Sequence, residues 1–260
     1  IPTLLDCRDL ALENNPEITK AKAIFKIAKE KEKQSLAAVL PSVGLSISRS
    51  KVDQDRTDNG INQRSQKYVT ESDSIALRQP LYRPRLFTEY KKSKLDVMAE
   101  KSFFNNKEDI LEMKVVETYF KLLRVQEESR LLKKNNILLE KQTQAAEKSI
   151  TAGRGTLTEL SELRAAYDKN QVDIISINQK LRLEISELSY LTGTEIDDVK
   201  GFNAKKKLIG FADIKLEDWE SSALLNNQEL KGLRGRIDAA KLSLSSEKFE
   251  RYPTVDLNMQ

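Results

Sequence analysis

Residues 85 to 152 contain neither glycine nor proline, and this stretch restricts the possible folds more than any other feature of the chain. Glycine and proline are the residues that most often end a helix, so their absence predicts one uninterrupted helix. At 1.5 Å per residue, that helix is roughly 100 Å long. Because a helix of this length overruns a compact domain, it must pack along a partner.

Apolar residues recur along this helix at steps of three and four, as expected for a packed helix. Val115, Tyr119 and Leu122 mark one ridge, and Val116, Phe120 and Leu123 mark its neighbour; Leu131-Leu132 and Ile137-Leu138-Leu139 continue the stripe. The pattern predicts an amphipathic helix with a continuous apolar side.

Residues 151 to 156, Thr-Ala-Gly-Arg-Gly-Thr, separate this helix from a second one. Gly153 and Gly155 allow the positive φ angles of a helix C-cap and a tight reversal. Either Thr156 or Thr158 can cap the returning helix, because a threonine hydroxyl accepts a hydrogen bond from a free backbone N–H. The segment therefore predicts the tip of a helical hairpin.

The helix lengths indicate what the hairpin packs with. The returning helix ends at Leu191, before Gly193, and is roughly 50–55 Å long. An N-terminal helix from Glu17 to Leu40, ended by Pro41, is roughly 35 Å long. Placed end to end, the two shorter helices come near the length of the long one. The predicted architecture is one long helix beside two stacked shorter ones.

The pattern changes from helical to strand-like after residue 41. Val43, Leu45 and Ile47 alternate with glycine and serine, which predicts a strand with one apolar and one small polar face. A second strand is predicted from residue 68 to residue 82. Two strands of this length between helices make the chain mainly helical with a small β part.

Two further segments lack periodicity. Residues 53–66 are polar and contain the turn signal Asp58-Asn59-Gly60, which predicts a loop between the strands. Residues 194–215 contain Gly201, Gly210 and the run Lys205-Lys206-Lys207, which predict a linker or small subdomain with one short strand, 208–211.

The opening of the chain returns near its end. Asn14-Asn15-Pro16-Glu17-Ile18 matches Asn226-Asn227-Gln228-Glu229-Leu230, and Pro41-Ser42-Val43-Gly44-Leu45 matches Pro253-Thr254-Val255-Asp256-Leu257. Both matches share an offset of about 212 residues, as a duplicated unit would. We therefore expect a first repeat over 1–193, the linker over 194–215 and the start of a second repeat over 216–260. On this division the chain holds one complete repeat and the opening of the next.

The composition argues against catalytic and nucleic-acid-binding functions. There is no histidine and one cysteine, so the commonest general base and the usual zinc ligands are absent. The 44 basic and 40 acidic residues are interleaved, which is unlike a nucleic-acid footprint. No phosphate loop, nucleophile motif or run of about 18 apolar residues occurs. We expect no enzyme activity, cofactor or metal site, and a buried, inert Cys7.

Several stretches together resemble the TolC family of outer-membrane efflux and secretion proteins. They are residues 11–18 (ALENNPEI), 40–45 (LPSVGL), 77–82 (LRQPLY) and 150–160 (ITAGRGTLTEL), followed by residues 164–168 (RAAYD). The resemblance covers nearly the whole chain and is weakest over the linker. Order, spacing and duplication carry it, since each stretch alone is short.

The resemblance implies a TolC-like fold, mainly α, in which an antiparallel coiled-coil-like hairpin is a segment of an α-barrel. The strands would belong to the outer-membrane β-barrel of a homotrimer, and the linker to a small equatorial domain. The implied function is a passive conduit for efflux or type I secretion. It would dock onto a periplasmic adaptor (membrane fusion protein) and an inner-membrane pump of the ABC or RND type. The implied location is the outer membrane of a Gram-negative bacterium, extending into the periplasm.

The resemblance also assigns roles to residues. Adaptor docking would fall on the tip residues Ala152, Gly153, Arg154 and Gly155, and tip closure on Thr158 and Glu159. Val43, Leu45 and Ile47 would face outer-membrane lipid. From the residues alone, plainer interpretations remain: turn glycines, a solvated arginine and an ordinary helix start.

Two other functions fit parts of the sequence. A soluble coiled-coil scaffold explains the hairpin but not the serine-alternating strands. A periplasmic adaptor also has a long hairpin, but its flanking lipoyl-like halves, rich in Gly and Val, have no counterpart here.

Overall fold

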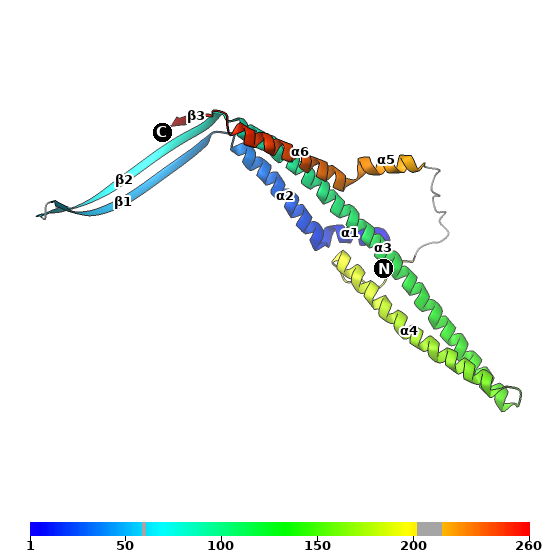
Figure 1. Ribbon diagram of the computed structural model, residues 1–260. Coiled ribbons are helices and arrows are strands. Elements are labelled where there is room, and N and C mark those ends of the chain that lie inside the picture. The colour runs from blue at the N-terminus through cyan, green and yellow to red at the C-terminus, as the bar shows by residue number, and fades with distance from the viewer. Residues whose placement is uncertain (59–60, 202–214) are drawn as a thin grey trace. The chain divides into compact units, whose positions relative to one another are not determined.

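The computed structural model describes residues 1–58, 61–201 and 215–260 (Figure 1). The elements are α1 (Leu4–Asn14), α2 (Pro16–Ala37), β1 (Ser42–Asp58), β2 (Ile61–Tyr82), α3 (Pro84–Thr151), α4 (Leu157–Thr192), α5 (Leu216–Asn226), α6 (Gln228–Phe249) and β3 (Val255–Met259). The chain divides into two compact units, Ile1–Ala23 with Phe103–Leu225, and Ile24–Ser102 with Asn226–Gln260. Within the described residues, no helix is both long and apolar enough to cross a membrane.

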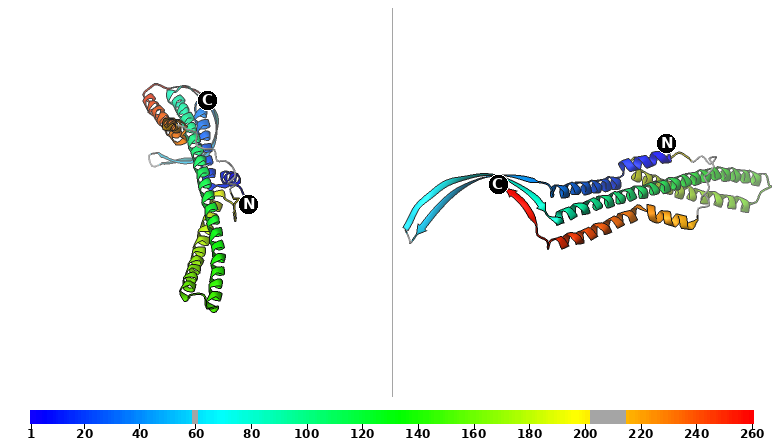
Figure 2. Two further views of the ribbon diagram at one scale, coloured as in Figure 1. Left: turned by 90° about the vertical axis from the view of Figure 1, so that its right-hand side faces the viewer. Right: turned by 90° about the horizontal axis from the view of Figure 1, so that it is seen from above.

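The long uninterrupted helix is confirmed. It is α3, which has 68 residues and starts at Pro84, a position where proline's missing N–H costs nothing. In the first unit α4 runs back alongside α3 in the opposite direction (Figures 1 and 2). The two helices form the predicted antiparallel hairpin.

The seam between α3 and α4 follows a heptad pattern. Shielded residues alternate at steps of four and three along α3: Leu111, Val115, Thr118, Leu122, Val125, Ser129, Leu132, Asn136, Leu139, Thr143, Ala146 and Ile150. The matching row on α4 is Leu160, Leu163, Tyr167, Asn170, Ile174, Ile177, Leu181, Glu184, Leu188 and Leu191. Such a 3.5-residue repeat is the signature of coiled-coil packing.

This seam separates the two predicted ridges of α3. Val115, Tyr119 and Leu122 are buried, whereas Val116 and Phe120 of the neighbouring ridge are 38% and 45% exposed. Further along, Leu132 and Leu139 enter the seam, but Leu131, Ile137 and Leu138 are exposed. The predicted continuous apolar stripe is therefore wider than the surface that α4 covers.

A larger core lies in the same unit, at the end of the seam away from the tip. Its buried members come from α1, the start of α2, α3, α4 and the segment after α4: Cys7, Ala11, Ile18, Leu111, Val115, Tyr119, Leu122, Leu188, Leu191, Ile196 and Val199. Cys7 is fully buried, and this burial raises the pKa of its thiol, with a further contribution from Asp6. The predicted burial of Cys7 is confirmed.

Asn15 joins the first turn of α2 to the last turn of α4. Its Nδ2 donates to the carbonyl of Leu191 at 3.0 Å, and its Oδ1 accepts from the N–H of Glu17 at 2.9 Å. Asn15 is 3% exposed, so both bonds are shielded from water. The Asn-Asn-Pro motif thus lies where α1 ends and α2 begins, beside the last turn of α4.

In the second unit, α6 packs closely against α3. A Cβ added to Gly235 would lie 3.2 Å from the Cβ of Ala99, which is itself 1% exposed. An ion pair between Arg236 and Glu100, at 3.0 Å, flanks this contact. Small residues at the contact allow the two helix backbones to approach.

The strands form an antiparallel sheet in the order β1-β2-β3 (Figure 2). The predicted loop over residues 53–66 is wrong, because β1 continues to Asp58 and β2 already starts at Ile61. An antiparallel ladder satisfies backbone groups whatever the side chains, so polar residues can extend it. Cross-strand ion pairs support it, with Asp53–Lys67 at 2.8 Å and Arg49–Glu71 at 3.0 Å. The predicted turn residues Asn59 and Gly60 lie outside the described residues.

The helices at the end of the chain repeat those at its start. α5 and α6 have 11 and 22 residues, as α1 and α2 do. Their bounds are offset by about 212 residues, the offset of the sequence matches. The division at residues 193 and 215 stays a prediction, and the lysine run and the short strand predicted within 202–214 lie outside the described residues.

The seam predicts a contrast between two leucines on α4. Leu188 is 0% exposed and Leu183 is 70% exposed. We expect Leu188→Ala to lower the free energy of unfolding by about 2–5 kcal/mol, because it removes buried methyl groups and leaves a cavity. In the monomeric chain, Leu183→Ala should stay within about 0.5 kcal/mol of the unsubstituted chain. Urea denaturation followed by circular dichroism measures both, and equal losses would contradict the assigned seam.

Candidate functional site

The tip of the hairpin is a reversal built on backbone hydrogen bonds. The N–H of Arg154 donates to the carbonyl of Ser149, and the N–H of Gly153 donates to the carbonyl of Ile150, both at 2.9 Å. This pair of bonds is the Schellman pattern that ends a helix. Gly153 occupies the left-handed position that the pattern requires, with φ +72°.

The two tip glycines are needed for different reasons. Gly153 has open space around it, so only its φ angle disfavours a side chain. At Gly155, a Cβ would lie 3.0 Å from both the backbone nitrogen and the Cγ1 of Ile150. Close backbone approach therefore selects glycine at position 155.

The returning helix α4 starts at a threonine cap. Of the two predicted candidates, Thr156 is the cap, and its Oγ1 accepts from the N–H of Glu159 at 3.2 Å. Thr158 and Glu159 lie exposed on the first turn of α4. Ala152, Gly153 and Arg154 are exposed as well, whereas Gly155 is half-buried. The structure thus brings the six predicted tip residues together on one small, accessible end of the hairpin.

An ion pair braces the hairpin just behind the tip. The guanidinium of Arg164 on α4 lies 2.8 Å from the carboxylate of Glu147 on α3. Both side chains are largely exposed, so water and salt screen this pair. The pair links the end of α3 to the beginning of α4.

The strand hairpin presents two chemically distinct faces. Val43, Leu45 and Ile47 are 71%, 67% and 72% exposed, so no described part of the chain covers them. The opposite face pairs small residues across the strands, with Gly44 opposite Ala76 and Ser46 opposite Ser74. The predicted alternation of an apolar and a small polar face is present in the register.

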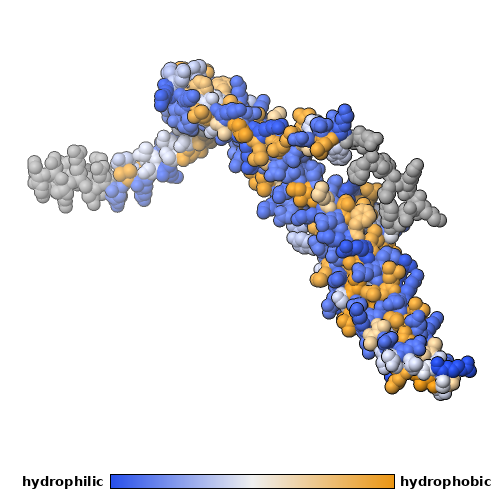
Figure 3. All heavy atoms as spheres, turned by 45° about the vertical axis from the view of Figure 1, so that its right-hand side comes forward, coloured by the Kyte–Doolittle hydropathy of each residue, from blue (hydrophilic) through white to orange (hydrophobic). Residues whose placement is uncertain are grey.

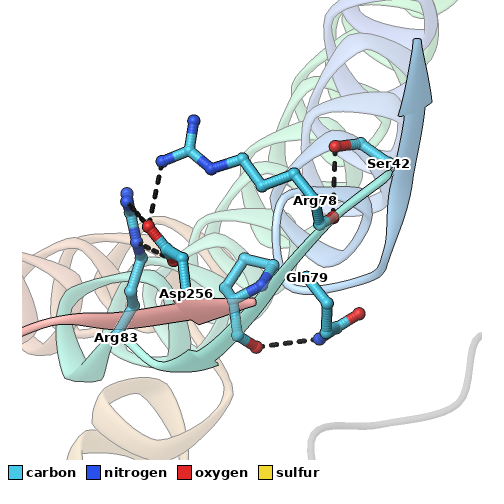
Figure 4. A network of polar contacts seen from close by, with 6 residues as sticks. Ser42, Arg78, Gln79, Arg83 and Asp256 are labelled. Atoms are coloured by element: carbon cyan, nitrogen blue, oxygen red, sulfur yellow. Dashed lines mark hydrogen bonds and ion pairs between the residues drawn. The ribbon is translucent and has the colours of Figure 1, made fainter. Parts of the chain in front are cut away.

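A cluster of charges holds β3 at the joint between strands and helices (Figure 4). Asp256 on β3 accepts from Nε of Arg83 at 2.6 Å and from Nη2 of Arg78 at 3.1 Å, and a second Arg83 nitrogen completes a bidentate pair. Planar pairing of this kind fixes direction as well as distance. Asp256 therefore ties β3 to β2 through Arg78 and to the connection between β2 and α3 through Arg83.

Polar bonds to the backbone complete the joint. Nε2 of Gln79 donates to the carbonyls of Pro80 at 2.8 Å and Val39 at 3.3 Å. The hydroxyl of Ser42 donates to the carbonyl of Arg78 at 3.3 Å (Figure 4). The end of β2 is thereby connected to the segment that precedes β1.

Sequence reasoning missed this charged joint. The repeat aligns Asp256 with Gly44, so the second copy carries a carboxylate where the first has no side chain. An acid at the start of an otherwise apolar strand was the available signal. Its arginine partners lie 178 and 173 residues away in the chain, and pairing over that distance has no sequence pattern.

A family model described as outer membrane efflux protein matches residues 7–194, which is well over half of the chain. The chain belongs to the outer membrane efflux protein family. The resemblance to TolC-type proteins is thus confirmed, and with it a location at the outer membrane of a Gram-negative bacterium. Members of this family are channels and ducts rather than enzymes.

Two secretion proteins are similar to this family member over nearly all of its length. The alkaline protease secretion protein AprF of Pseudomonas aeruginosa is 25% identical over 259 residues, covering 98% of this chain and 54% of AprF. The proteases secretion protein PrtF of Dickeya chrysanthemi is 25% identical over 264 residues, covering 98% of this chain and 56% of PrtF. The chain therefore spans about half the length of these curated relatives.

Solved structures show the same fold. A crystal structure of CusC, described for the conformational changes that accompany its folding and transmembrane channel formation, superposes with a TM-score of 0.83 at 15% identity. The superposition covers 98% of this chain and 58% of CusC. The chain therefore has the same fold as the matched part of CusC.

The tip geometry predicts that alanine is unfavourable at both glycines. Gly153→Ala forces a side chain into the left-handed region at a cost of about 1–2 kcal/mol. Gly155→Ala should destabilise through the contact with Ile150. Gly201→Ala is the control, because Gly201 has open space and lies outside the left-handed region. Thermal unfolding measures all three, and a tip substitution as mild as the control would contradict the assigned turn.

The joint predicts that Asp256 protects β3 from opening. Asp256→Asn removes the charge shared by two arginines, so the β3 amides should exchange faster with deuterium. Glu71→Gln is the control, since its ion pair with Arg49 is largely exposed and weak. The exchanged pair Arg83→Asp with Asp256→Arg should restore part of the protection. Equal exchange in Asp256→Asn and the unsubstituted chain would show that the joint does not hold β3.

Proposed function

We propose that this chain forms part of the wall of an outer-membrane duct, a passive conduit for efflux or type I secretion. The observation that carries the proposal is the family match over residues 7–194, which spans the helical hairpin and the strand pair together. The scaffold alternative lacks a role for the two-faced strands. The adaptor alternative is disfavoured by the same match, since the matching family is that of the channel.

Exposed apolar residues along the hairpin support self-association as a homotrimer. Met113 is 73% exposed on α3, and Val172, Leu183 and Tyr190 are 64%, 70% and 70% exposed on α4. Hydrophobic residues reach the surface of the helical part between hydrophilic ones (Figure 3). Side chains of this size gain free energy when a neighbouring helix covers them. Adjacent copies packed side by side would build an α-barrel wall.

The strand faces support insertion in a membrane barrel. In such a barrel apolar side chains face lipid and polar ones face the water-filled interior. Val43, Leu45 and Ile47 would contact outer-membrane lipid, and the glycine, alanine and serine face would line the lumen. An edge strand has no backbone partners of its own in lipid, so these strands require closure with other copies.

The exposed tip is the proposed contact with a periplasmic adaptor. Ala152, Gly153, Arg154 and Gly155 would form the contact, and Thr158 and Glu159 would take part in closing the duct between neighbouring hairpins. The adaptor would in turn connect the duct to an inner-membrane pump of the ABC or RND type, which supplies the energy. The names of AprF and PrtF favour secretion of a protein, and hence an ABC-type pump.

The duct and its tip can be tested separately in the bacterium that produces the protein. A duct predicts heat-modifiable trimers in the outer-membrane fraction, and their absence would contradict the proposed assembly. Arg154→Glu should abolish export and adaptor cross-linking while trimers persist, because it reverses an exposed charge without touching the turn. Lys148→Glu, on the exposed last turn of α3, is the matched control and should export normally. Unchanged export by Arg154→Glu would remove the tip from the docking surface.

A further inference from the structure

One layer of the hairpin seam is built from amides instead of apolar side chains. Asn136 on α3 and Asn170 on α4 both occupy heptad seam positions, between Leu132 and Leu139 on one helix and Tyr167 and Ile174 on the other. Asn170 is only 4% exposed. A buried amide at such a position lowers stability unless its hydrogen bonds are satisfied.

The hydrogen bonds of this layer cross the seam. Nδ2 of Asn170 donates to Oδ1 of Asn136 and to the carbonyl of Leu132, both at 3.2 Å, and its Oδ1 accepts from Asn135 at 3.1 Å. Gln171 adds a bond at 3.1 Å to the same Asn136 oxygen. The amide of Asn170 thus uses both of its hydrogens and its oxygen, all with α3.

The layer is aligned with the tip. Asn136 and Asn170 are 34 residues apart, and Gly153, the left-handed residue of the turn, lies midway between them. The amide layer and the turn therefore specify the same register of α3 against α4. Two unrelated features of the chain agree on one alignment.

Apolar layers alone do not select that alignment. Sliding α4 by one heptad replaces the contact of Leu132 with Ile174 by a contact with Leu181, a residue of similar size, at little cost. The amides respond differently. Shifted by one heptad in one direction, Asn136 would face Ile177, and shifted in the other it would face Leu163. In both cases its amide would lose its partner, which disfavours the shifted register.

We propose that the Asn136–Asn170 pair sets the register of the hairpin and so fixes the position of the tip along α3. A single polar pair in a coiled-coil seam is able to specify alignment in this way, at some expense in stability. Asn136 and Asn170 are positioning residues, and their role concerns the hairpin itself, whatever substance the protein conducts. A failed export experiment would leave it intact.

Moving one amide by a heptad tests the proposal without changing the composition. In the swap Asn170→Ile with Ile177→Asn, the two amides face each other only if α4 slides by one heptad. The control swap Leu163→Ile with Ile177→Leu leaves the amide layer in place. Both are made in the full chain with Cys7→Ala, so that no native thiol interferes.

Oxidative cross-linking reports the register directly. The native register places Leu132 opposite Ile174, and the shifted one places it opposite Leu181. Leu132→Cys is therefore combined with Ile174→Cys in one set of chains and with Leu181→Cys in another. In the amide swap, the shifted-to-native ratio of disulfide yields should rise at least about fivefold, the effect of one unpaired amide. In the control swap the ratio should not change.

A second variant covers the case in which the amide swap does not fold, which loss of the helical circular dichroism signal would reveal. Asn136→Leu with Asn170→Leu replaces the amide layer with an apolar one. It should unfold at a higher temperature than the unsubstituted chain and yet give more of the shifted disulfide, because stability and alignment come from different layers. An unchanged ratio in the double-leucine chain, or in a folded amide swap, would overturn the proposal.

Discussion

The antiparallel seam between α3 and α4 is the contact on which the first unit depends. Most of the stability of a helix in a protein comes from packing of its apolar face, so the 68-residue α3 requires a partner along its length. The seam supplies one through a regular heptad row, and it becomes a broader core where α1 and the segment after α4 add Cys7, Ile196 and Val199. Stability is therefore concentrated at the end of the hairpin far from the tip, and the tip end relies on a narrow seam.

Polar groups in this framework mark places where alignment matters. Asn15 joins α2 to α4, and the Asn136–Asn170 pair joins α3 to α4, each through shielded amide bonds. In the second unit ion pairs have this role, because Asp256 binds two arginines at the joint between strands and helices. Apolar contacts hold the elements together, while these directional bonds select one arrangement among several of similar apolar burial.

Large parts of the surface have the chemistry of an interface. The apolar strand residues Val43, Leu45 and Ile47, and the hairpin residues Val172 and Leu183, are more than half exposed. The proposed duct wall would give that exposure a reason, because it would bury such surfaces against lipid and against neighbouring copies.

The sequence by itself determined the elements that depend on local chemistry. Absence of glycine and proline predicted α3 to within a residue at each end, paired glycines predicted the tip, and serine alternation predicted two-faced strands. Local reasoning predicted strands that are too short. Residues 53–58 and 61–66 are polar, but they pair through backbone hydrogen bonds, which form whatever the side chains are. Only the tertiary structure decided which of two apolar ridges faces α4. It also decided that Asn170 hydrogen-bonds to Asn136 and that Asp256 forms an ion pair with Arg83. These are contacts between residues far apart in the chain, and periodicity identifies a face of a helix but not the partner that covers it.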